Sequence, residues 1–156
     1  MHQARLRAVL FGGLIGGAGD ILFAIVFAGI HGRSPVWLLQ TVATGVLGQS
    51  AYDGGVPAAL LGLAGHFTMS FLWAALFVAL AARIPQLVTK PAISGLVYGV
   101  LVFLAMRLVV LPASAFPYPV SFKLESAGPD LLSHMFLFGL PIALAASRAF
   151  APARGT

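Results

Sequence analysis

Four ionisable side chains stand inside long apolar runs of the chain: Asp20, His66, Arg107 and His134. A charge at the middle of a bilayer costs at least about 2.5–3.5 kcal/mol on insertion scales, so such residues usually face neighbouring helices and pair there. A carboxylate, a guanidinium and two imidazoles are groups that form ion pairs, relay protons, bind polar ligands or hold metals. Any chemistry of this chain therefore depends first on these four residues.

Each of the four belongs to a different run, and their depths can be estimated from the rise of about 1.5 Å per helical residue. Asp20 and His66 then lie roughly 15 and 13 Å from the outer ends of their runs, and Arg107 and His134 roughly 7 Å. All four fall in the outer half of the membrane, which predicts one polar cluster there. We expect Asp20 to pair with Arg107, and the histidines to relay protons or bind a small solute. The alternative is a polar core with a structural role only.

Metal and haem sites are weaker alternatives. Asp20, His66 and His134 offer three metal ligands, but no pair has the close spacing on one helix that is typical of a metal site. His66 and His134 could ligate a haem with Arg107 at a propionate, although their estimated depths differ by roughly 6 Å. Ser70 and Ser133 lie near histidines but not in a nucleophile elbow, which argues against an enzyme. We expect no cofactor and no catalytic residue.

A proline-rich segment with aromatic residues, 113–128, precedes the last run. Phe116 and Tyr118 are typical of an anchor at the membrane interface. The other possibility is a lid over the polar cluster, with Glu125 pointing inward. Glu125 therefore joins the candidate residues.

The composition explains why these residues stand out. Of the 156 residues, 60% are hydrophobic and only 8% are charged, whereas a soluble domain has roughly a quarter of its residues charged. The sequence thus predicts an all-α bundle in a single transmembrane domain, 1–156, and its partner is the lipid bilayer. The net charge of +5 comes from scattered residues with no basic run, so nucleic acid is not expected. The four expected transmembrane helices cover about 8–30, 57–82, 91–111 and 129–150, and the first runs too far for a signal peptide.

The segment 34–52 is uncharged and has helical periodicity, so it could be an interfacial helix, a re-entrant helix or a fifth span. The number of basic residues on each side of the membrane decides between these three possibilities. With four spans and the N-terminus inside, the basic residues divide six inside to two outside: Arg5, Arg7, Arg83, Lys90, Arg148 and Arg154 against Arg33 and Lys123. A fifth span inverts this distribution. We therefore expect cytoplasmic termini and a short amphipathic helix, about 35–50, on the outer face.

Small residues recur at helical spacing where helices would meet. Gly12 and Gly16, and Gly13 and Gly17, lie four apart, and the pairs Gly95/Gly99 and Gly62/Gly65 follow the same principle. Such spacings let helix backbones approach closely in lipid. Remaining glycine faces would serve a homodimer or a larger membrane complex.

Three stretches, together with Gly65–Phe67, carry a resemblance to known proteins: Gly17–Leu22, Gly48–Gly55, and Gly95–Gly99 with Met106–Pro112. With them, the chain resembles a family of small bacterial four-helix integral membrane proteins, and it is more distantly similar to YagU-like inner-membrane proteins. The resemblance implies four helices and a bacterial inner membrane, and no activity. In that group the position of Arg107 is often Asn, which argues against a mechanism that requires its charge.

The sequence therefore predicts a membrane protein that handles a small solute or a proton through the polar cluster. The alternatives are a haem- or metal-binding redox protein and an accessory subunit of a larger membrane complex.

Overall fold

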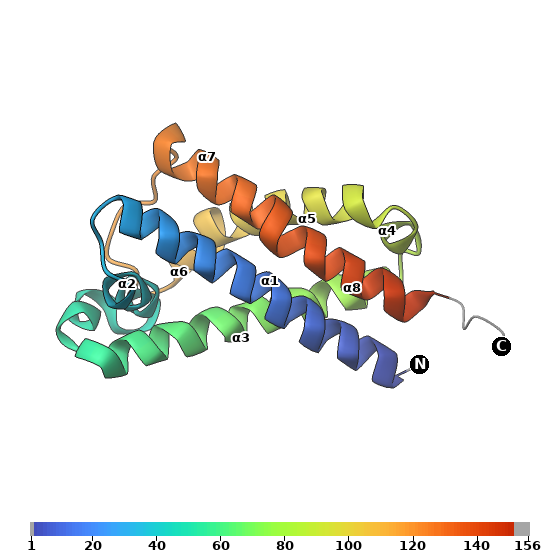
Figure 1. The fold of residues 1–156 in the computed structure, drawn as a ribbon, viewed down its shortest axis with the longest axis horizontal. Coiled ribbons are helices and arrows are strands. Elements are labelled where there is room, and N and C mark those ends of the chain that lie inside the picture. Colours follow the sequence, from blue (N-terminus) through green and yellow to red (C-terminus); the bar gives the residue numbers. More distant parts are fainter. Residues whose placement is uncertain (1, 152–156) are drawn as a thin grey trace.

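The computed structural model describes residues 2–151, and within them it is a bundle of helices (Figure 1). Its elements are α1 (His2–Ile30), α2 (Pro35–Leu47), η1 (Gly48–Asp53), α3 (Gly55–Ala81), α4 (Gln86–Thr89), α5 (Pro91–Ala105), η2 (Met106–Val110), α6 (Leu111–Ala113), α7 (Leu124–Ser133), η3 (His134–Gly139) and α8 (Leu140–Phe150). The segments α5–η2–α6 and α7–η3–α8 are continuous, so these elements make four long helices and a few short ones.

Four of the helical segments are long and apolar enough to cross a membrane: His2–Ile30, Gly55–Ala81, Pro91–Ala113 and Leu124–Phe150. The prediction of four long apolar helices is thus confirmed, but the first and last begin five or six residues earlier than expected. The last was expected to start at Pro129, which instead lies inside α7. Proline is favourable at a helix start but does not require one.

The segment 34–52 does not form a long helix. Ser34 caps α2 by accepting a hydrogen bond from the Trp37 N–H at 3.1 Å, and the helix ends after 13 residues. At about 1.5 Å per residue it is about 20 Å long, too short for a hydrocarbon core of about 30 Å. Figure 1 views α2 almost end-on, so it crosses the direction of the long helices at the end remote from the termini.

Close approaches hold the bundle together. Gly12 faces α8, because a Cβ there would lie 3.2 Å from the Cα of Ile142, and Gly13 faces Phe71 of α3. Hydrogen bonds between helices add to this packing, from Ser70 Oγ to the Gly13 carbonyl and from Tyr98 to the Trp73 carbonyl, each 2.6 Å long. The predicted seams therefore exist. Gly65 differs, because nothing lies within 4 Å of a Cβ built there.

Two π-helical turns interrupt the third and fourth long helices. The Leu111 N–H bonds to the Met106 carbonyl in η2, and the Leu140 N–H bonds to the Met135 carbonyl in η3, each spanning five residues. Pro112 and Pro141 follow these turns directly. Proline lacks an N–H and its ring crowds the carbonyl four residues before it, so the wider turns relieve that conflict. Arg107 lies in η2 and His134 begins η3, so both are carried by irregular helix.

Candidate functional site: a cavity beside a partly buried ion cluster

Arg107 is held by three kinds of contact. Its Nη2 donates to Asp130 Oδ2 at 2.8 Å, and its Nη1 donates to the Ser121 carbonyl. The guanidinium carbon also lies 4.8 Å and 5.7 Å from the ring centroids of Phe103 and Phe122. Stacking and charge pairing together fix this side chain. The prediction that Arg107 pairs with Asp20 was wrong, because Arg107 pairs with Asp130.

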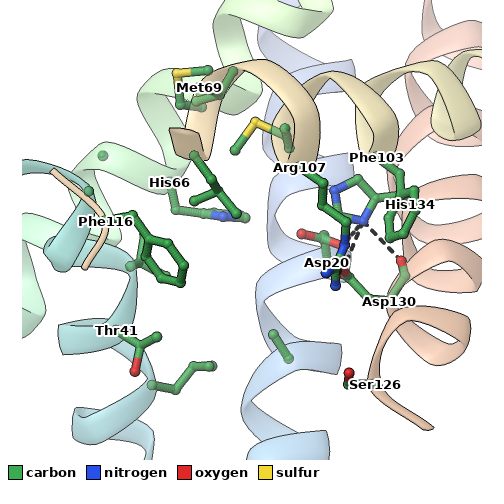
Figure 2. Close-up of a pocket in the computed structure, with 18 of the residues that line it drawn as sticks. Asp20, Thr41, His66, Met69, Phe103, Arg107, Phe116, Ser126, Asp130 and His134 are labelled. Atoms are coloured by element: carbon green, nitrogen blue, oxygen red, sulfur yellow. Dashed lines mark hydrogen bonds and ion pairs between the residues drawn. The ribbon is translucent and has the colours of Figure 1, made fainter. Parts of the chain in front are cut away.

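His134 lies between two carboxylates (Figure 2). Its Nδ1 is 2.9 Å from the backbone oxygen of Asp130, 3.2 Å from Asp130 Oδ1 and 3.6 Å from Asp20 Oδ1. A carbonyl oxygen only accepts, so we assign the Nδ1 proton to the bond with the Asp130 carbonyl. The other ring nitrogen, Nε2, forms no hydrogen bond with the described residues, so it offers a lone pair in the neutral ring.

Asp20 reaches the same cluster from α1. Its Oδ1 accepts a hydrogen bond from Ser133 Oγ at 2.6 Å, and Ser133 is only 2% exposed. Its second oxygen, Oδ2, has no hydrogen-bond partner among the described residues. This oxygen is not fully buried. The Asp20 side chain keeps 15% of its surface accessible, so it can accept one more donor.

His66 stands apart from this cluster, on α3. Its Nε2 is 2.9 Å from the Gly17 carbonyl, so Nε2 is the donor and Nδ1 is left as an acceptor. Figure 2 shows His66 on one side of an open space, with Asp20, Arg107 and His134 on the other. The predicted cluster of four is thus a compact group with His66 facing it.

A partly open cavity of about 820 Å³ separates His66 from the cluster. Asp20, His66, Arg107, Asp130 and His134 all line it, with aromatic and aliphatic side chains around them. The space left at Gly65 is part of its wall. The lining includes the aromatic residues Phe23, Phe27, Trp37, Trp73, Phe103, Phe116 and Phe138. The cavity is therefore mainly apolar, with one cluster of charged groups at Asp20, Arg107, Asp130 and His134, and Arg33 also lines it.

Some residues of the segment 113–128 line this cavity and others do not. Phe116, Ser121 and Ser126 line it, and the Ala115 N–H donates to the Gly45 carbonyl of α2 at 3.0 Å. This segment therefore covers part of the cavity. Glu125 is exposed in the first turn of α7 and is not among the lining residues.

Asp20, Asp130 and His134 could in principle hold a metal, because one ligand atom from each lies within 4.8 Å of the others. The surrounding bonds argue against this use. The His134 Nδ1–H already donates to the Asp130 carbonyl, and the Arg107 guanidinium occupies Asp130. A cation would have to displace both. The triad that the sequence offered as a weak alternative, with His66 in place of Asp130, does not come together at this distance among the described residues.

Asp130 and Ser133 were not foreseen as site residues. Asp130 follows Pro129, at the boundary of the membrane that the sequence predicts, where a carboxylate is unremarkable. The one signal in the sequence was its spacing, since Asp130 and His134 are four apart and share one helix face. Ser133 gave no such signal, because its role depends on α1 lying alongside.

Comparison with known proteins finds no family model, no curated protein and no solved structure that matches this chain.

Proposed function

We propose that the chain is a multi-pass protein of a bacterial inner membrane, with cytoplasmic termini and α2 on the outer face. The charge distribution supports this orientation. Arg5, Arg7 and Arg148 lie at the end of the bundle that carries the termini, whereas Arg33 and Lys123 lie in the connections at the other end. Basic residues collect on the cytoplasmic side of membrane proteins. The cavity then lies in the outer half.

Within this membrane protein, we propose that the cavity binds a small molecule with a cationic, hydrogen-bond-donating head and an apolar body. One observation carries the proposal: both sides of the cavity offer acceptors without partners among the described residues. These are Asp20 Oδ2, His66 Nδ1 and His134 Nε2, each left over after its side chain has bonded elsewhere.

The ring N–H groups of His66 and His134 already have partners. Arg33 also lines the cavity, and its guanidinium carbon lies 4.6 Å from the centroid of the Trp37 ring. Both terminal nitrogens of Arg107 donate hydrogen bonds within the protein. Its Nε has no partner among the described residues but is buried, so this nitrogen is not accessible to a ligand. Two carboxylates and one guanidinium leave the cluster with one negative charge while His134 is neutral. A protonated amine supplies the missing positive charge and up to three donors, and aromatic walls attract cations through their ring faces. A carboxylate ligand would meet repulsion from Asp20.

The size of the cavity favours a molecule over a bare ion. Ligand pockets commonly measure about 300–1,000 Å³ and combine apolar walls with a few placed polar groups. The cavity falls in that range at about 820 Å³. An amine with one aromatic ring fits both its volume and its mixed surface.

The test uses the protein's own fluorescence. Its two tryptophans, Trp37 and Trp73, both line the cavity. We expect phenethylamine to change their emission with saturation, and 3-phenylpropionate, which carries a carboxylate on a similar skeleton, to have no such effect. Phenethyl alcohol should bind more weakly than the amine. Equal or tighter binding of the carboxylate would refute the proposed ligand class.

Proton handling is a second candidate, favoured by the contact of His134 with two carboxylates. Its test is proton flux into liposomes that contain the purified protein. We expect His134→Gln to abolish any flux above that of empty liposomes. Equal flux with and without His134 would exclude this role.

A further inference from the structure

A second groove lies at the opposite end of the bundle, between α1 and α8. Its volume is about 780 Å³, and it is lined by Arg7, Phe11 and Ile15 on one side and by Leu140, Leu144 and Arg148 on the other. The floor is narrow because the two helices touch behind it, where a Cβ on Gly12 would lie 3.3 Å from the Cβ of Ala145. The groove is thus a shallow apolar channel with two arginines.

Helical spacing places the two arginines at the same end of the channel. Arg7, Phe11 and Ile15 follow one another at intervals of four on α1, and Arg148, Leu144 and Leu140 do so on α8. The helices run in opposite directions, so both rows begin with arginine at the end of the bundle that carries the termini (Figure 1). From there the apolar part extends about 12 Å along the helix axes.

No acidic side chain of residues 2–151 forms an ion pair with either of these arginines. The chain has only four acidic residues, Asp20, Asp53, Glu125 and Asp130, and none belongs to this end of the bundle. Arg7 and Arg148 are both exposed and have no ion pair among the described residues. Two guanidiniums that line the same end of one groove are well suited to the oxygens of a phosphate group.

We propose that this groove binds one anionic phospholipid, with the phosphate between Arg7 and Arg148 and an acyl chain along the channel. Charge complementarity identifies the headgroup, and the apolar row identifies the chain. Phe11 and Ile15 are 59% and 55% exposed, so they offer a hydrocarbon chain contact that a free phosphate ion would leave unused. Basic pockets between membrane helices on the cytoplasmic side are typical lipid headgroup sites.

The test is native mass spectrometry of the detergent-solubilised protein with added phosphatidylglycerol or phosphatidylcholine of identical acyl chains. We expect retention of phosphatidylglycerol at concentrations where phosphatidylcholine is lost. Arg7→Gln/Arg148→Gln should weaken phosphatidylglycerol binding about 25-fold, because each arginine near an anionic headgroup contributes roughly fivefold. Millimolar inorganic phosphate should not displace the lipid.

The matched control is Arg83→Gln/Lys90→Gln, which removes the same charge from the same end of the bundle but from outside the groove. It should change the affinity less than about twofold. If the groove variant fails to fold, Leu144→Trp provides an independent test, since it fills the channel and leaves both arginines in place. It too should reduce lipid retention.

Several outcomes would overturn the proposal. Equal losses in the two double variants would mean diffuse attraction and no site. Displacement by phosphate would mean a free-anion site, and equal retention of both lipids would mean no headgroup recognition. The same spectra report subunit number, so a dimer whose groove variant loses its second copy and no lipid would assign the groove to a protein contact.

Discussion

Replacing Asp130 with Asn removes the charge that neutralises Arg107 and keeps the size of the side chain. The Nη2–Oδ2 distance of 2.8 Å marks a direct ion pair. The amide introduced by Asp130→Asn can still accept a hydrogen bond, but the Arg107 charge, held against Phe103 and Phe122, would have no carboxylate in direct contact. The variant therefore isolates the electrostatic part of the cluster.

The expected cost follows from the burial of the two partners. Breaking a fully buried pair costs about 3–5 kcal/mol and breaking an exposed one about 0–1 kcal/mol. The Arg107 side chain is 15% exposed and that of Asp130 is 38% exposed, so the pair lies between these limits. We expect a loss of about 1–3 kcal/mol in the free energy of unfolding.

The measurement is reversible unfolding in mixed micelles, followed by circular dichroism. Arg107→Met on the Asp130→Asn background removes the stranded charge, so the double variant should regain part of the loss. Glu125→Gln, which removes an exposed carboxylate on the same helix, should stay within about 0.5 kcal/mol of the unchanged protein. A single variant as stable as the unchanged protein, or a double variant no better than the single, would refute the ion-pair assignment.

Three further predictions concern packing and the cavity wall. Gly62→Val should destabilise the protein strongly, because a Cβ there would meet the backbone of Leu39 on α2. Gly29→Val should not, because nothing lies within 4 Å of a Cβ built there. Thermal unfolding of both variants checks this prediction. Ser70→Ala should lower the free energy of unfolding by about 1 kcal/mol, since it removes a buried hydrogen bond to the Gly13 carbonyl. Thr68→Ala should lower it less, because its hydrogen bond is exposed and lies within one helix. The same unfolding measurement compares the two variants. Ser133→Ala should weaken phenethylamine binding by a few-fold, because Asp20 then loses the donor that orients it, with tryptophan emission as the readout and unchanged affinity as the contrary result.

The four long helices followed from composition, because runs of some 20 apolar residues admit few other structures. The exclusion of a fifth span came from counting charges, and the 13-residue length of α2 agrees with it. The first and last residues of the helices could be predicted less accurately from the sequence. Pro129 looks like a helix start in sequence, but the turn before it is also helical.

The partners within the site could not be read in the same way. Depth along a helix indicates level, and it placed Arg107 and His134 together correctly. It does not indicate which face of a helix meets which neighbour. Asp130 therefore replaced Asp20 as the partner of Arg107, and the π-helical turns at η2 and η3, which rotate the faces that follow them, had no separate signal beyond Pro112 and Pro141.

The central claim is that the free oxygen of Asp20 receives a cationic head in the cavity. The most direct measurement is the dissociation constant of phenethylamine, from tryptophan emission, for the unchanged protein, Asp20→Asn and Glu125→Gln. Hydrogen bonds to charged groups contribute about 1.5–3 kcal/mol, so Asp20→Asn should weaken binding about 10- to 150-fold. Glu125→Gln, outside the cavity wall, should leave the constant unchanged. Equal affinity in Asp20→Asn and the unchanged protein would contradict the account.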